Sequence, residues 1–173
     1  MTSPHEDVVA VVPATRLVLS APLDGVVHAL EDVPDHVFAA GIAGPGVAIE
    51  PDRPVHGPAL AHAPVAGRLV TLFAHAFAVE PSPGTTVLVH LGIDTVRLAG
   101  EGFALYAAEG EEVAQGDPVI GWDPDAVEAR GLGVLSPVVA LQAEPDSVEL
   151  LVQPGRRVTA GTPLLAWTLA AAA

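Results

Sequence analysis

Two histidines on separate apolar stretches are the side chains of this sequence best suited to chemistry. His75 lies within the stretch 72–79, and His90 begins the run His-Leu-Gly-Ile-Asp-Thr-Val at 90–96. A neutral imidazole is a nucleophile near pH 7 and afterwards a good leaving group, so it can carry a group from one partner to another. If the two stretches pair as strands of one hairpin, the rings can face each other on one side of the sheet. Spacing alone leaves a second interpretation open, in which two unrelated strand histidines are each satisfied locally.

The sequence supports a metal-dependent activity less well than it supports group transfer by these two histidines. The remaining histidines are scattered, and neither H-x-H nor H-E-x-x-H spacing occurs, which disfavours a zinc hydrolase. The sequence has no cysteine, so disulfides, thiolate catalysis and cysteine-based zinc sites are excluded. We expect no resident cofactor or metal, although His75 and His90 could together pick up adventitious zinc.

Other common catalytic and binding motifs are missing from the sequence. The glycine-rich segments 41–46 and 131–134 complete neither a dinucleotide fingerprint nor a P-loop, and no serine lies in a G-x-S-x-G elbow. Four serines lie in turn-like surroundings and are interpreted as turn residues: Ser20, Ser82, Ser136 and Ser147. The repeated glycine-bounded hairpins resemble those of biotin- and lipoate-carrying domains, but such domains need a lysine and this sequence has none.

The chain is strongly acidic, with a formal net charge of −14 at pH 7. This balance argues against nucleic acid and anionic membranes as partners and favours a basic protein. The most apolar early stretch, 8–23, is interrupted by Pro13, Arg16 and Pro22, so we expect no membrane insertion. We see no signal-peptide pattern and expect a cytoplasmic protein.

Composition and repeats predict an all-β fold. Short apolar runs bounded by turn residues predict strands at 26–28, 46–49, 67–70, 76–79, 86–90 and 94–98, and helical signals occur only at 34–38 and 123–131. The pattern G-x-x-V-x-x-G-x-P occurs at 110–118 and again at 155–163, and a second repeat relates 21–27 to 63–70. Duplicated hairpins of this kind predict an antiparallel β-sandwich or barrel with internal pseudo-symmetry. We expect a leader at 1–16, one domain at 17–169 and a frayed tail at 170–173.

The run at 90–96, followed by Gly-Glu-Gly-Phe at 100–103, resembles the active-site signature of a known domain. This is the glucose-type enzyme IIA domain of the bacterial phosphoenolpyruvate-dependent sugar phosphotransferase system. The resemblance extends in order from about residue 18 to 169, through the segments 21–25, 33–38, 44–49, 63–67, 75–77 and 136–139. Such colinearity is more specific than any one motif.

The resemblance implies a compact antiparallel β-sandwich that acts as a phosphotransferase component through a phosphohistidine intermediate. The oligomeric state is open, with a monomer favoured. His90 matches the histidine that accepts a phosphoryl group on Nε2 from the phosphocarrier protein HPr, and His75 matches a second, non-phosphorylated histidine. The group then passes to a cysteine of an enzyme IIB domain for sugar uptake. A non-catalytic regulator that binds partner enzymes through the same face is the alternative.

The implied docking face is apolar with an acidic rim. Asp35 and Asp94 match carboxylates that meet basic side chains of the partner, and Gly92 lets the backbone approach His90. The apolar positions, which could also be ordinary core, are Val37, Phe38, Ile42, Phe73, Leu88 and Val96. The sequence departs from the family in lacking the threonine that hydrogen-bonds the second histidine.

Overall fold

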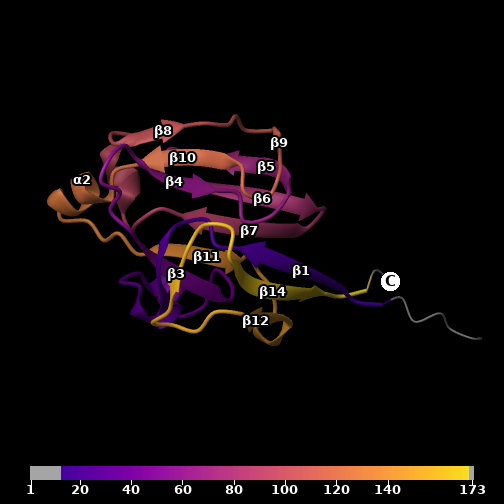
Figure 1. Cartoon of the computed structure of the whole chain (residues 1–173). Coiled ribbons are helices and arrows are strands. Elements are labelled where there is room, and N and C mark those ends of the chain that lie inside the picture. Colours follow the sequence, from indigo (N-terminus) through magenta and orange to yellow (C-terminus); the bar gives the residue numbers. More distant parts are fainter. Residues whose placement is uncertain (1–12, 172–173) are drawn as a thin grey trace, which may run out of the picture.

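The computed structural model describes residues 13–171, which are mainly short antiparallel strands (Figure 1). The strands are β1 (Thr15–Ser20), β2 (Gly25–Ala29), β3 (Gly46–Pro51), β4 (Ala59–His62), β5 (Gly67–Leu72), β6 (Ala76–Ser82), β7 (Thr85–His90), β8 (Phe103–Leu105), β9 (Glu112–Val113), β10 (Pro118–Trp122), β11 (Ser136–Ala140), β12 (Val148–Leu150), β13 (Arg157–Val158) and β14 (Pro163–Leu169). The helices are α1 (His36–Ala39) and α2 (Pro124–Ala129), with 3-10 turns η1 (Leu30–Asp32), η2 (Thr95–Leu98) and η3 (Pro145–Ser147).

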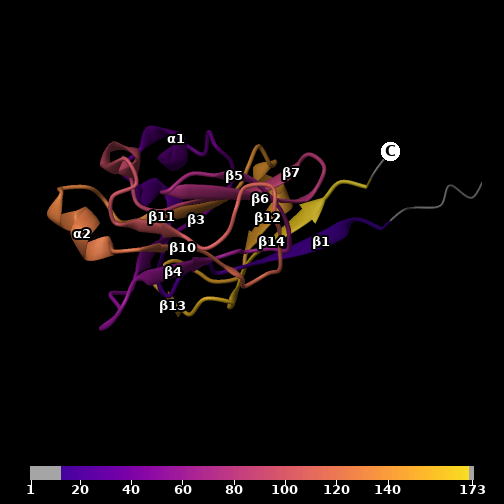
Figure 2. The same ribbon diagram turned by 90° about the horizontal axis from the view of Figure 1, so that it is seen from above.

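The strands form three sheets around a shared core. The largest has eight strands in the order β13-β2-β3-β11-β7-β6-β5-β9, and two three-stranded sheets have the orders β4-β10-β8 and β1-β14-β12. Figure 2 separates the layer containing β4 and β10 from the layer containing β5 and β6. Leu19, Leu69 and Ile120, one from each sheet, are fully buried in the same cluster. The predicted antiparallel β-sandwich is confirmed.

The two sequence repeats adopt matching backbone conformations. The first glycines of the repeat, Gly110 and Gly155, have φ angles of 91° and 92°. The amide of Gly110 donates a 2.7 Å hydrogen bond to a carbonyl of β5, and that of Gly155 donates one of 2.7 Å to a carbonyl of β2. The repeated valine is buried in both copies, and it pairs with Gly67 in one copy and with Gly25 in the other. A Cβ on Gly25 would lie 2.0 Å from the carbonyl oxygen of Glu50, so the second repeat needs glycine for close strand approach.

The two predicted helical segments are confirmed, and each begins at an aspartate cap. Asp123 accepts a hydrogen bond from the amide of Ala126 at the start of α2, and Asp35 accepts from the amides of Val37 and Phe38 at the start of α1. These caps satisfy amides that a short helix leaves unpaired. Asp35 therefore has a structural role in addition to its predicted place on the docking rim.

Two local predictions were wrong. The predicted strand at 94–98 is the 3-10 turn η2, because Asp94 and Ala99 on either side adopt left-handed conformations with φ of 60° and 50°. His75 does not lie inside a strand: it lies in the turn between β5 and β6, immediately before Ala76. A short apolar run does not by itself reveal a turn that is made by neighbouring tertiary contacts.

The ends of the described chain lie side by side. β1 lies beside β14, as Figure 1 shows, and Thr15 is opposite Leu169 in the strand register. β1 therefore starts within the segment assigned to a leader, of which residues 1–12 lie outside the described residues, as do residues 172–173 of the assigned tail. Arg16 forms an ion pair of 3.0 Å with Glu149 of β12.

Candidate functional site

The β6–β7 hairpin brings the two candidate imidazoles together. Ala76 is opposite His90 in the strand register, and the amide of Leu91 donates a 2.8 Å hydrogen bond to the carbonyl oxygen of His75. The ring centroids of His75 and His90 lie 5.1 Å apart, with an angle of 70° between the ring planes. The predicted juxtaposition of the two rings is thus confirmed, although one histidine comes from a turn.

The His90 ring is held by a backbone carbonyl only two residues further along the chain. Its Nδ1 lies 2.7 Å from the carbonyl oxygen of Gly92. A carbonyl can only accept, so Nδ1 carries the proton and the neutral ring presents an unprotonated Nε2. This is the tautomer that leaves Nε2 available as a nucleophile.

Gly92 is required for this arrangement. Its φ is +70°, a left-handed conformation that side chains rarely adopt. A Cβ at this position would lie 2.6 Å from the carbonyl oxygen of Gly133 and 2.8 Å from Cγ2 of Thr95. The tight turn after β7 therefore depends on glycine both for its backbone conformation and for space.

Both imidazoles favour the neutral form. Burial lowers the pKa of His90, although the hydrogen bond to Gly92 and the charges of Asp35 and Asp94 oppose this effect. Burial, followed by the positive charge of His90, lowers the pKa of His75. A lowered pKa keeps Nε2 of His90 unprotonated at neutral pH, as a nucleophile requires.

Aromatic rings frame the two histidines. The ring of Phe38 lies 5.5 Å from that of His90, and the ring of Phe73 is stacked on that of His75 at 5.8 Å. Phe38 is only 8% exposed and belongs to a second core cluster, against which the half-buried Leu88 packs. Phe38 is therefore buried beneath the site, and Leu88 is half-buried.

The remaining predicted apolar positions are exposed. The exposed fractions are 48% for Val37, 58% for Ile42, 59% for Phe73 and 64% for Val96. Asp94, two residues before Val96, is exposed, and Asp35 is half-buried. Exposed apolar side chains beside carboxylates and two histidines are typical of a surface that another protein contacts transiently.

Comparisons with known proteins agree with this geometry. A family model described as the phosphoenolpyruvate-dependent sugar phosphotransferase system, EIIA 1, matches residues 17–146. The chain belongs to this enzyme IIA family. A solved structure of the glucose permease IIA from Mycoplasma capricolum superposes with a TM-score of 0.78 and 33% identity, covering 88% of this chain and 96% of that one.

Two curated relatives show how such domains occur. The glucose-specific EIIA component of Bacillus cereus is 39% identical over 121 residues, which are 69% of this chain and 70% of the relative. The beta-glucoside-specific EIIBCA component of Bacillus subtilis is 37% identical over 137 residues, 78% of this chain. The match spans only 22% of that relative, so this enzyme IIA domain corresponds to one part of a longer protein there.

Sequence reasoning missed two buried hydroxyls beside the site of this enzyme IIA domain. Ser136, interpreted as a turn residue, begins β11 and is fully buried, and Thr95 is 1% exposed. The hydroxyl of Thr95 donates to the carbonyl oxygen of Leu91 at 2.7 Å, and that of Ser136 accepts from the amide of Gly92 at 3.2 Å. Their position inside the colinear family segments was the available signal.

Among the described residues, the structure shows neither a metal-binding cluster nor a helix that could span a membrane. Within residues 13–171, no group of three or more His, Cys, Asp or Glu side chains is placed to hold a metal ion. Adventitious zinc between His75 and His90 stays a prediction. The helices of the same residues are all too short or too polar to cross a membrane.

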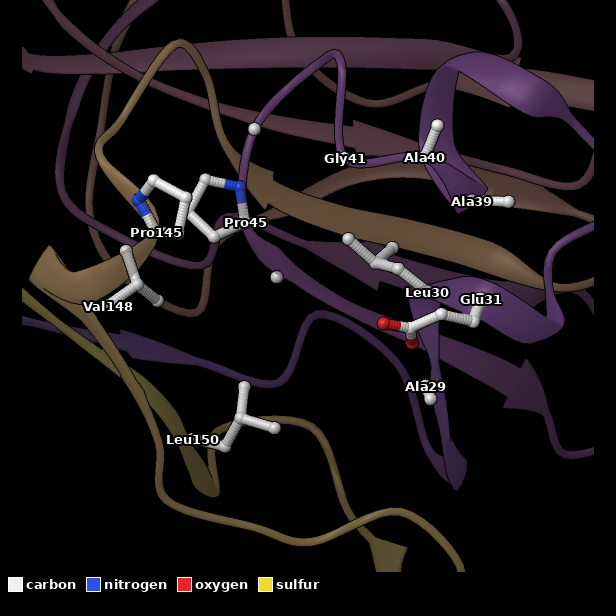
Figure 3. Close-up of a pocket in the computed structure, with 12 residues that line it drawn as sticks. Ala29, Leu30, Glu31, Ala39, Ala40, Gly41, Pro45, Pro145, Val148 and Leu150 are labelled. Carbon is white, nitrogen blue, oxygen red and sulfur yellow. The ribbon is translucent and has the colours of Figure 1, made fainter.

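A cavity elsewhere on this enzyme IIA domain offers little chemistry. It has a volume of about 280 Å³ and lies among η1, the end of α1 and β12 (Figure 3). Its lining is mostly apolar, from Leu30 to Leu150, with Glu31 as its one titratable side chain. Neither His75 nor His90 lines this cavity, so the candidate site remains the surface around these two histidines.

Proposed function

We propose that this enzyme IIA domain is a phosphoryl carrier, with His90 as the residue that carries the phosphoryl group. The proposal rests above all on the His90 ring, whose Nδ1 is hydrogen-bonded to the carbonyl oxygen of Gly92 while a second imidazole lies beside it. Phosphoryl transfer needs positioning and charge stabilisation more than covalent help from the protein. The neutral His90 ring, whose Nδ1 is held by the Gly92 carbonyl, provides this positioning.

The first transfer step makes the His90 ring formally cationic, because Nε2 gains the phosphoryl group while Nδ1 keeps its proton. The lone pair of Nε2 of His90 attacks the phosphorus of the donor's phosphohistidine, and a new N–P bond forms as the donor's N–P bond breaks. The electron pair of the broken bond returns to the donor imidazole. The Nδ1 proton of His90 stays in its hydrogen bond with Gly92 throughout, so the ring needs no separate base.

The second step reverses the role of His90. A thiolate of the acceptor attacks the phosphorus, a P–S bond forms, and the electron pair of the N–P bond returns to Nε2. His75 has the geometry to donate a hydrogen bond to a phosphoryl oxygen on His90 during this delivery step, because its ring lies 5.1 Å from that of His90. His75 is therefore proposed as the group that steadies the phosphoryl oxygens.

The partners follow from the family and from the surface. We propose HPr as the phosphoryl donor and the cysteine of an enzyme IIB domain as the acceptor. The transfers would serve sugar uptake, and we place this protein in the cytoplasm. Homologues that include EIIB and EIIC parts in one chain, such as the Bacillus subtilis relative, support the second partner. Exposed Ile42 and Val96, with the carboxylate of Asp94, suit brief contacts with basic partners.

Intact-mass spectrometry tests this proposal directly. With phosphoenolpyruvate, enzyme I and HPr, the wild-type protein should gain one phosphoryl group that is lost in acid. His90→Ala should gain none, and His75→Ala should gain the group but pass it slowly to an enzyme IIB domain. His56→Ala, which removes an exposed histidine from the β3–β4 loop, is the matched control and should behave as wild type. Normal phosphorylation of His90→Ala would refute the assignment.

The same face also suits a regulator that binds partner enzymes without transferring a group. The observation that favours this second function is the exposed apolar surface beside the two histidines, which includes Val37, Ile42 and Val96. Affinity capture with phosphorylated and unmodified protein separates the two functions. A partner that binds only the unmodified form, and receives no phosphoryl group, would establish regulation.

A further inference from the structure

Buried hydroxyl groups are concentrated around the turn that follows His90. Among residues 13–171, the buried polar side chains are Ser20, Thr95 and Ser136, and two of these three contact residues 91–92. Burying a hydroxyl is costly unless it is hydrogen-bonded, and valine or alanine would pack in such a core without that cost. The concentration of hydroxyls at this turn therefore calls for a functional reason.

Ser136 connects the turn to the segment before β11. Its hydroxyl donates to the carbonyl oxygen of Val134 at 3.0 Å and accepts from the amide of Gly92 at 3.2 Å. Gly92 in turn accepts the Nδ1 proton of His90 at 2.7 Å. Two sets of hydrogen bonds, one from Val134 through Ser136 to the Gly92 amide and one from the Gly92 carbonyl to the imidazole, thus meet at the backbone of Gly92.

The neighbouring backbone groups of the turn are also fixed. The amide of Leu91 donates to His75, its carbonyl accepts from Thr95, and the amide of Ile93 donates to the carbonyl oxygen of Gly133 at 2.9 Å. The Gly92 carbonyl shares its peptide group with the Ile93 amide, which Gly133 holds, whereas Ser136 and Thr95 both hold the preceding peptide group, between Leu91 and Gly92. Among these interactions, the hydroxyl of Ser136 is the one side-chain group that hydrogen-bonds to Gly92 itself.

We propose that Ser136 is a positioning residue for phosphoryl transfer: through the amide of Gly92 it fixes the carbonyl oxygen that orients the His90 ring. Thr95 supports the same turn through Leu91. This inference rests on the proposed role of His90, but its first consequence concerns the unphosphorylated ring. Loss of the hydroxyl should loosen the Gly92 carbonyl, weaken the bond to Nδ1 and let the ring sample its other tautomer.

The experiment compares Ser136→Ala with Ser136→Thr and with Ser20→Ala. Ser20 is the matched control, because its hydroxyl is also buried and donates to the carbonyl of Pro64 at 3.3 Å, in contact with neither histidine. Nitrogen-15 NMR of the imidazoles reports the tautomer and pKa of His90 in the free protein. Phosphorylation by phospho-HPr, followed by intact mass, reports the rate.

Ser136→Ala should populate the Nε2-protonated tautomer, lower the pKa of His90 further and slow phosphorylation by about tenfold. Ser136→Thr should restore both readouts to near the wild-type values, and Ser20→Ala should change neither. If Ser136→Ala does not fold, Thr95→Val replaces it and should produce the same direction of change. An unchanged tautomer and rate in Ser136→Ala would overturn the inference. A wild-type protein that HPr never phosphorylates would instead refute the proposed function, while the NMR comparison still tests the positioning.

Discussion

The carbonyl oxygen of His75 accepts a hydrogen bond of 2.8 Å from the amide of Leu91, the residue that follows His90. The two histidines are therefore joined through the backbone, not only by the proximity of their rings. Removing one imidazole should leave the other in place. Each ring can then be tested separately without loss of the fold.

Replacing His75 by alanine should separate acceptance of the phosphoryl group from its delivery. The backbone bond to Leu91 survives this change, so Nε2 of His90 remains available and the protein should still be phosphorylated. Delivery to an enzyme IIB domain should slow by about 10–100-fold, because the donor to the phosphoryl oxygens is lost. Rapid-quench measurements of both half-reactions check this, and equal slowing of the two would contradict it.

Removing His90 should raise the pKa of His75. Burial lowers this pKa first and the charge of His90 lowers it further, so His90→Ala removes the second cause. The C2 proton of His75, followed by NMR from pH 8 to pH 4, should titrate at a higher pH in the variant than in wild type. His56→Ala is the control; a pKa of His75 that stays the same or falls in His90→Ala would contradict the coupling.

Acid should destabilise the fold partly through these two rings. Both pKa values lie below 6.5 in the folded protein, so the unfolded chain binds protons first as the pH falls through about 6.5. Their contribution to stability is therefore complete above pH 6.5 and is lost as the pH drops toward the folded-state values. Urea unfolding at a series of pH values should show a smaller loss in a His75→Gln, His90→Gln double variant than in wild type.

Sequence reasoning reached the fold and the two histidines but not the scaffold around them. The repeats at Gly110 and Gly155 and the aspartate caps leave local signals, because glycine and capping residues are required by backbone conformation. The buried roles of Ser136 and Thr95 leave no such local signal, since they depend on which segments meet in space, and only their place in the family segments pointed to them. Phe38 shows the same limit, because exposure of an apolar residue depends on its tertiary neighbours.

Exposed apolar residues of the site should affect docking and not stability. Val96→Ser and Ile42→Ser change side chains that are 64% and 58% exposed, so the free energy of unfolding should change by less than about 0.5 kcal/mol. Both variants should raise the concentration of phospho-HPr needed for half-maximal rate. Val55→Ser is the control, since Val55 is 89% exposed in the β3–β4 loop. Equal docking by Val96→Ser and wild type would exclude Val96 from the interface.

The acidic rim should act mainly through the rate of association. Asp94→Asn removes an exposed carboxylate two residues before Val96, so association with a basic partner should slow and become less sensitive to salt. Stopped-flow measurements between low and physiological ionic strength check both effects. A variant with the same salt dependence as wild type would show that Asp94 lies outside the encounter surface.

Gly92→Ala tests the backbone requirement at the centre of the site. The new methyl group would meet the carbonyl oxygen of Gly133 at 2.6 Å in a residue with φ of +70°, so unfolding free energy should fall by about 1–3 kcal/mol or more. Gly84→Ala is the matched control: its φ is +79°, and nothing lies within 4 Å of the added Cβ. It should lose only about 1 kcal/mol, from the left-handed conformation alone. Urea titration measures both losses, and phosphorylation by phospho-HPr should fail or slow strongly in Gly92→Ala only. Equal losses of stability with normal phosphorylation in both variants would mean that the carbonyl of residue 92 tolerates displacement and does not orient His90.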